Sequence, residues 1–143
     1  MKTVKDVMTE QVVTVTPQDN IYEAAVKMRD NDTGIIPVVD ESDRSTLIGV
    51  VTDRDLVIRG YADKHSGSTG VETVMTRDIR TASLDMSVDE AADLMASQQV
   101  RRLPVTDNRR LLGIVSIGDL AVRGVYADEA GSALSSISEQ QLH

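Results

Sequence analysis

The chain carries the same sequence pattern twice, and this repeat constrains its fold more than any other feature. Residues 4–60 align with residues 71–124, at a constant offset of 67 residues up to Asp40 and Asp107. The first copy then has three additional residues before the alignment resumes. Each copy has about 55 residues, a length that is marginal for independent folding. We therefore expect the two copies to fold together around a shared interface.

A polar stretch rich in glycine and serine separates the copies. The composition predicts a first repeat at 2–61, a linker at 62–70, a second repeat at 71–125 and a tail at 126–143. The tail is expected to form a short helix or to be disordered. Because the chain starts with Met1 and shows no second kind of domain, we expect any effector to be a separate protein.

A capping signal and an apolar stripe predict the first helix of each copy. A polar residue is followed three positions later by glutamate at Asn20–Glu23 and Ser87–Glu90, as in a capping box. Behind these starts, apolar residues recur at the i, i+3, i+4, i+7 spacing of one helical face. The residues are Ile21, Ala24, Ala25 and Met28 in the first copy and Val88, Ala91, Ala92 and Met95 in the second.

Three β-prone stretches and a closing helix complete each copy. Strands are predicted at 12–15, 35–39 and 47–51 in the first copy and at 79–82, 103–106 and 111–115 in the second, with closing helices at 53–59 and 117–123. Pro37 and Pro104 lack a backbone donor, which predicts edge strands, or a bulge or free side at the proline. Gly60 and Gly124 follow the closing helices and are predicted as left-handed caps. The order strand, helix, strand, strand, helix indicates an α+β fold.

Composition excludes several functions. The content of 41% hydrophobic and 27% charged residues is typical of a soluble protein, and no apolar run has the ~18 residues of a membrane span. The net charge of −8, with three Tyr and no Trp or Phe, argues against nucleic-acid binding. The chain has no Cys, so it has no disulfide or thiolate metal site. We expect a cytoplasmic protein without membrane or nucleic-acid partners.

The sequence does not predict an enzyme. The two histidines, His65 and His143, lie in the linker and at the terminus, and neither belongs to a cluster of ligands or of nucleophile and base. We therefore predict no catalytic residue, no metal site and no required cofactor.

A hydroxyl residue, two further residues and an aspartate follow the last strand of each copy. These hydroxyl-x-x-Asp motifs are Thr52 to Asp55 and Ser116 to Asp119. A hydroxyl beside the free N–H groups of a helix start suits a phosphate or a sugar, and a carboxylate can accept hydrogen bonds from both vicinal hydroxyls of a ribose. The same pattern is also a capping box with Asp in place of Glu. Both interpretations stay open, and they are compatible.

The two copies together resemble a tandem pair of CBS domains, a Bateman module, of the small stand-alone bacterial type. The resemblance covers about residues 2–125 and rests on the Val-Met-Thr openings, the proline-containing strands and the hydroxyl-x-x-Asp endings. It implies two βαββα units packed as a pseudo-twofold pair. It also implies adenosine-containing ligands in two clefts between the units, and a homodimer.

The resemblance assigns the binding residues crosswise between the copies. One cleft would combine Ser116, Asp119 and Arg102 with Thr16, Ile21, Gly34 and Ile35, and the other would combine Thr52, Arg54 and Asp55 with Ser83, Val88 and Arg101. Gly34 and Ile35 stand where the second copy has Arg101 and Arg102, so we expect unequal affinities. Arg101 and Arg102 can equally be a solvated pair or form an ion pair between the copies.

The resemblance implies a regulatory module that senses an adenine nucleotide of the AMP, ADP or ATP class, with NAD and S-adenosylmethionine as further candidates. AMP is the expected ligand, and an effector protein would read the resulting change in conformation. The alternative is a ligand-free dimeric interaction module in which the two motifs act only as helix caps. In that case the apolar helical faces would serve dimerisation.

Overall fold

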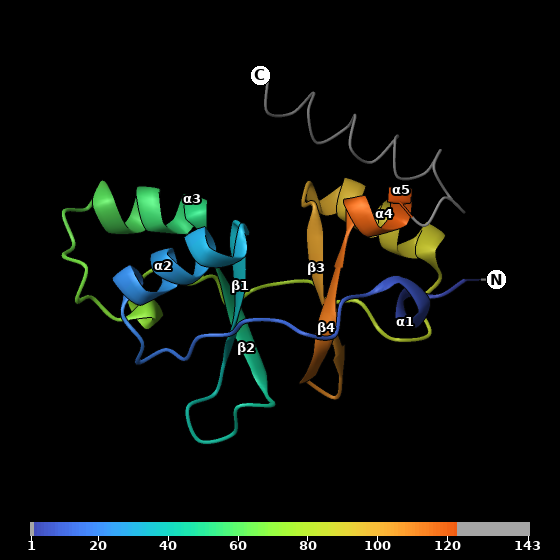
Figure 1. Cartoon of the computed structure of the whole chain (residues 1–143), viewed down its shortest axis with the longest axis horizontal. Coiled ribbons are helices and arrows are strands. Elements are labelled where there is room, and N and C mark those ends of the chain that lie inside the picture. The colour runs from blue at the N-terminus through green and yellow to red at the C-terminus, as the bar shows by residue number, and fades with distance from the viewer. Residues whose placement is uncertain (1, 123–143) are drawn as a thin grey trace. The chain divides into compact units, whose positions relative to one another are not determined.

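The computed structural model describes residues 2–122, which form two compact units (Figure 1). The first-repeat unit consists of Val12–Ile79 and Arg109–Leu111. Within the described residues, the second-repeat unit consists of residues 2–11, Arg80–Asn108 and residues 112–122. Each unit combines helices with a small antiparallel sheet, which confirms the predicted α+β class. The predicted tail and the cap at Gly124 lie outside the described residues.

The first-repeat unit is built on the β1–β2 hairpin. Its elements are α2 (Ile21–Asn31), β1 (Ile35–Val39), β2 (Leu47–Thr52), α3 (Asp53–Asp55), the π-helical turn η1 (Leu56–Tyr61) and the 3-10 turn η2 (Val71–Thr73). The strands pair antiparallel, with Ile36 opposite Val51. Val15, Ile36, Val38 and Val51 are fully buried beneath α2 and belong to one core cluster.

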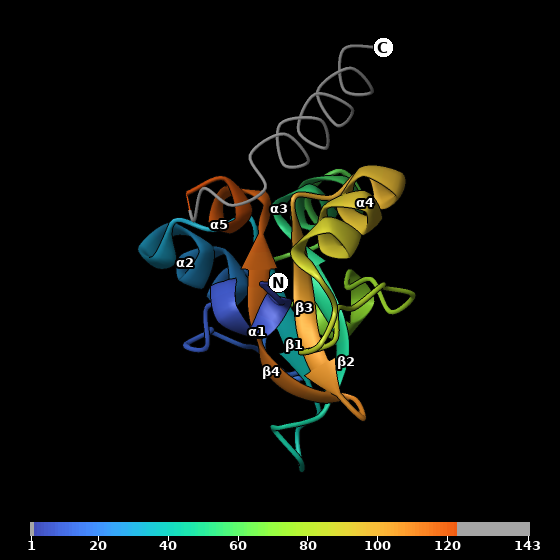
Figure 2. The ribbon, with the colours of Figure 1, turned by 90° about the vertical axis from the view of Figure 1, so that its right-hand side faces the viewer.

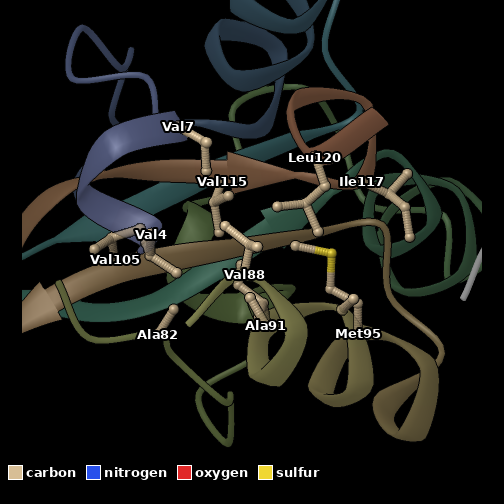
Figure 3. Packing of buried hydrophobic residues seen from close by; sticks show 12 residues of the cluster. Val4, Val7, Ala82, Val88, Ala91, Met95, Val105, Val115, Ile117 and Leu120 are labelled. Carbon is tan, nitrogen blue, oxygen red and sulfur yellow. The ribbon is translucent and has the colours of Figure 1, made fainter. Parts of the chain in front are cut away.

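The second-repeat unit repeats this plan. Its elements are α1 (Val4–Val7), α4 (Val88–Gln98), β3 (Arg102–Asp107), β4 (Arg110–Ser116, of which residues 112–116 belong to this unit) and α5 (Ile117–Val122). Figure 3 shows its core, in which Met95 of α4 extends toward Leu120 of α5. Met95 is fully buried.

The predicted helix starts are confirmed, with one error on the apolar face. The side chains of Asn20 and Ser87 accept hydrogen bonds from the backbone N–H groups of Glu23 (2.8 Å) and Glu90 (3.1 Å). All four predicted apolar residues of α4 are buried. In α2, however, Ala25 is exposed, because the buried stripe of this helix contains only Ile21, Ala24 and Met28.

The predicted outer strands are shorter than expected. The stretches 12–15 and 79–82 each contribute one bridging residue, Val15 beside Val38 and Ala82 beside Val105, both parallel. β1 and β3 each pair with one strand and gain only a single bridging residue on the other side, so the predicted edge position holds for the sheets themselves. Pro37 has no N–H to donate toward the 12–15 segment. Its carbonyl forms the hydrogen bond with this segment instead, accepting from Val15 N at 3.1 Å. A register shift follows at Val38/Val39.

The first closing helix continues past its predicted end. α3 continues directly into η1. The hydrogen bonds of η1 join residues five positions apart, as where Ala62 N donates to Val57 O at 2.8 Å. Gly60 therefore lies inside the helix and is not a cap. Gly60 is buried, and a Cβ there would lie 3.3 Å from Ile21 Cδ1. The glycine therefore allows η1 and α2 to lie close together.

The opening segment of each repeat completes the unit of the other repeat. In α1, Val4 N donates to Met86 O at 2.9 Å, and Val4 and Val7 are buried in the core of the second-repeat unit. Figure 2 shows α1 beside the β3–β4 hairpin, and Figure 3 shows Val7 pointing toward Val115. Likewise Val71 N donates to Asp19 O at 2.7 Å in the first-repeat unit. The compact units and the sequence repeats therefore differ at their openings.

The two Val-Met-Thr segments form the last bridge of each sheet. Thr76 bridges Val50 through two backbone hydrogen bonds of 2.8 and 2.9 Å, and Thr9 bridges Ile114 through two of 2.9 Å. The neighbouring strand residue is a glycine in both cases. A Cβ would lie 2.5 Å from Thr76 O at Gly49 and 2.5 Å from Thr9 O at Gly113, closer than any real contact.

The three additional residues of the first copy lie in an ordered turn. The Asp40 carboxylate accepts from Ser42 Oγ (2.8 Å) and Asp43 N (3.0 Å), and Asp43 accepts from Ser45 Oγ (2.6 Å) and Thr46 Oγ1 (2.9 Å). These hydrogen bonds lower the pKa of both carboxyl groups.

Replacing Gly113 with alanine should destabilise the protein by about 1–3 kcal/mol, because the new Cβ would push the Thr9 segment off β4. Gly118→Ala is the matched control, since a Cβ at Gly118 meets only Ser116 Oγ at 3.6 Å. Chemical denaturation of both variants measures the difference. Equal stability of the two variants would contradict the close approach.

Candidate functional site

The Thr52–Asp55 motif forms a complete capping box at the start of α3. Asp55 N donates to Thr52 Oγ1 at 3.0 Å, and Thr52 N donates to Asp55 Oδ2 at 3.0 Å. Asp55 is only 8% exposed. Its carboxylate therefore lies at the end of β2 with one side held by the backbone of the motif.

The Asp55 carboxylate has a second partner that the sequence did not predict. Thr76 Oγ1 lies 3.3 Å from Asp55 Oδ1 and 3.2 Å from Oδ2, and donates to this carboxylate. Thr76 is the last residue of the Val-Met-Thr segment that opens the second repeat. The repetition of this segment in both copies is the only feature of the sequence that marks Thr76. Only the bridge to β2 brings the hydroxyl within reach.

The Ser116–Asp119 motif forms the same capping box at the start of α5. Asp119 N donates to Ser116 Oγ at 3.0 Å, and Ser116 N donates to Asp119 Oδ2 at 2.9 Å. Asp119 is partly buried, and within 2–122 its side chain forms no further hydrogen bond. This carboxylate therefore keeps acceptor capacity that Asp55 uses internally.

Besides the Thr52–Asp55 motif, four predicted binding residues lie in the first-repeat unit. Thr16 is 2% exposed, and its Oγ1 has no hydrogen-bond partner in the described part of the chain. Ile21 is buried at the start of α2, and Ile35 is partly buried at the start of β1. Gly34 O accepts from Asp53 N at 2.9 Å, which places Gly34 against the first turn of α3.

Their counterparts lie in the second-repeat unit in different environments. Ser83 is exposed, and its hydroxyl donates to Asp85 Oδ1 at 2.8 Å. Val88 is buried at the start of α4. Arg101 is exposed and its carbonyl accepts from Ile117 N at 2.9 Å, whereas Arg102 is partly buried at the start of β3.

Within each unit, the structure brings the residue before the proline strand to the motif of its own copy. Gly34 lies beside Asp53, and Arg101 lies at the start of α5. Arg54, in the first turn of α3, is exposed. The crosswise combination of residues from both repeats stays a prediction.

Arg59 lies in the last turn of η1. Its guanidinium also donates to Met75 O at 3.2 Å and to Val74 O at 3.4 Å, contacts that the sequence did not predict. This side chain fixes the segment that carries Thr76.

Other site types have no support among residues 2–122. This part of the chain holds no group of three or more His, Cys, Asp or Glu residues suited to a metal ion. No helix in it is long and apolar enough to span a membrane. A surface depression of about 510 Å³ is lined by Tyr61, Ala62, Lys64 and His65, and contains none of the predicted binding residues.

Residues 4–60 and 71–124 each match the family model of the CBS domain. The chain is 52% identical over 139 residues to the uncharacterized protein YlbB of Bacillus subtilis, covering 97% of this chain and 93% of the relative. It is 45% identical over 143 residues to the CBS domain-containing protein YhcV of the same organism, covering 100% of both. It is 37% identical over 122 residues to hypoxic response protein 1 of Mycobacterium tuberculosis, covering 85% and 84%.

Solved structures agree with these relatives. The structure of hypoxic response protein I with two coordinated zinc ions has a TM-score of 0.76 at 32% identity, covering 86% of this chain and 99% of that chain. CBSX2 in complex with AMP has a TM-score of 0.77 at 25% identity, covering 90% and 99%. The CBS domain pair of protein MJ0100 with 5-methylthioadenosine and S-adenosyl-L-methionine has a TM-score of 0.75 at 29% identity, covering 86% and 95%. The chain therefore belongs to the CBS domain family and carries the domain twice, as a tandem pair.

Proposed function

We propose that the protein is a regulatory module that binds an adenine nucleotide between its two CBS repeats and relays the resulting change to a partner protein. The observation that carries this proposal is the Asp119 carboxylate, which is fixed by its own capping box and accepts no further hydrogen bond from residues 2–122. A ribose offers two vicinal hydroxyl donors that match it. AMP is the first ligand to test, because a similar CBS protein is known in complex with AMP.

The orphaned hydroxyl of Thr16 supports the same site. A buried hydroxyl without a partner costs about 1–3 kcal/mol, so a ligand that supplies a hydrogen bond there would recover this energy. Its counterpart Ser83 is exposed and already bonded to Asp85. The two observations favour the predicted residue set that contains Asp119 and Thr16.

A second function rests on an exposed apolar surface. Tyr22 on α2 is 65% exposed, and Val57, Ile58 and Tyr61 on η1 are 56%, 50% and 83% exposed. Large apolar side chains grouped on one unit favour contact with another protein. In this alternative the protein is a ligand-free dimeric interaction module, and the capping boxes have no further role. Homodimerisation and a cytoplasmic location are also compatible with nucleotide sensing and form part of the proposal.

The Asp55→Ala/Asp119→Ala double variant tests nucleotide binding. We expect AMP to raise the melting temperature of the wild-type protein, since a ligand at 100 times its Kd stabilises the folded state by about 2.7 kcal/mol. The double variant should lose this shift. Asp6→Ala is the matched control, because Asp6 accepts from Thr3 N in a similar helix start and lies outside the predicted site. Equal shifts in all three proteins, or no shift at millimolar nucleotide in the wild type, would exclude the proposed function.

Replacing Thr16 with valine should have opposite effects on stability and on binding. Without nucleotide, Thr16→Val should stabilise the protein by about 1 kcal/mol, because it removes a buried hydroxyl that has no partner. Its affinity for AMP should fall. Ser83→Ala is the control and should change neither the stability nor the affinity for AMP. Denaturation and calorimetric titration separate the two effects, and a Thr16→Val variant that loses stability would contradict the orphaned hydroxyl.

A further inference from the structure

The two hydroxyl-x-x-Asp motifs are alike in sequence but differ in what their carboxylates already bind. Asp55 accepts from Thr52 N and from the hydroxyl of Thr76, which reaches both of its oxygens. Asp119 accepts from Ser116 N through Oδ2, and among residues 2–122 it accepts from no other group. In Asp55 the Thr76 hydroxyl therefore competes with a ribose for both oxygens, whereas within residues 2–122 only the backbone cap competes for Asp119.

Three hydrogen bonds to backbone groups hold the Thr76 segment in place. Two are the bridging hydrogen bonds with Val50, of 2.8 and 2.9 Å. The third is the hydrogen bond from the Arg59 guanidinium to Met75 O, at 3.2 Å. Gly49 allows the segment to lie this close, since any Cβ would collide with Thr76 O. The hydroxyl is thus fixed beside Asp55 by the fold of its own unit.

Thr9 is the counterpart of Thr76 in the other unit, and it shows that the sequence alone does not create this contact. Thr9 forms the equivalent bridge with Ile114, at 2.9 Å in both directions. Its side chain is exposed and, in the described part of the chain, donates no hydrogen bond to Asp119. The same residue type therefore closes one motif and leaves the other open.

We propose that Thr76 keeps the Asp55 motif closed to nucleotide, so that the protein binds one nucleotide per chain, at the Asp119 motif. This inference rests on the proposed nucleotide-sensing function. A ribose that uses both oxygens of the buried Asp55 would compete with a hydroxyl that already lies within 3.3 Å of each of them. The loss of the hydrogen bond from this hydroxyl corresponds to about a ten- to hundredfold weaker affinity. Thr76 is thus a residue that determines which motif is used.

The inference predicts that removing the Thr76 hydroxyl creates a second binding site. Calorimetric titration with AMP should give one site per chain for the wild type. Asp119→Asn should weaken binding at least about tenfold, because the remaining motif is closed. Thr76→Val should add a second site, and the Thr76→Val/Asp119→Asn double variant should bind AMP again.

Two matched controls separate the hydroxyl from general effects on the fold. Thr76→Ser keeps a hydroxyl, so in the Asp119→Asn background it should not restore binding. Thr9→Val removes the counterpart hydroxyl and should leave the wild-type titration unchanged. Circular dichroism and thermal unfolding identify variants that fail to fold, and Thr76→Ala replaces Thr76→Val if the latter does.

The outcomes distinguish this inference from the function on which it rests. If neither the wild type nor Thr76→Val binds AMP, the proposed function is wrong and the inference falls with it. If the wild type binds two nucleotides per chain, or if Asp119→Asn binds as well as the wild type, nucleotide binding stands and the closed motif is wrong. A Thr76→Val protein that is folded and gains no site would also overturn the role of Thr76.

Discussion

The close approach of a backbone segment to a strand glycine is the constraint on which both units depend. At Gly49 and Gly113 there is no space for a Cβ, because the carbonyls of Thr76 and Thr9 lie against the strand. Each approach adds a bridging residue to a hairpin that has only two strands, and two-stranded sheets are marginal alone. The segments that make these bridges also bring buried valines into each core. The glycines therefore determine both how each sheet is completed and how its core is filled.

The sequence predicted the elements well wherever the signal was local. The helix starts at Asn20 and Ser87 follow from side-chain capping, and the hairpin strands follow from their apolar runs. The exposure of Ala25 could not be predicted, because the periodicity fits both α2 and α4 and only tertiary packing decides which face is covered. The exchange of the opening segments was also missed. A local pattern does not indicate which repeat a segment completes.

In the candidate site too, the sequence predicted the local contacts and not the long-range ones. Both hydroxyl-x-x-Asp motifs lie at helix starts, with the expected hydrogen bonds, because capping is a property of neighbouring residues. The contact between Thr76 and Asp55 spans 21 residues and depends on the backbone bridge to Val50. The contacts of Arg59 could not be predicted for the same reason, since its partners are backbone carbonyls, which every residue offers. Differences between two similar repeats therefore arise mainly from contacts that the sequence pattern does not encode.

Capping and ligand binding compete only for particular oxygen atoms. A carboxylate has two oxygens and about four acceptor positions, and a capping box uses one of them. In Asp119 the backbone donor reaches Oδ2. The remaining positions can accept two vicinal hydroxyls without loss of the cap. In Asp55 the single hydroxyl of Thr76 lies within 3.3 Å of both oxygens, so a second donor already competes for the positions that a ribose would use. The motif alone therefore does not define a binding site, and the number of donors already present around its aspartate decides whether a ribose can be bound.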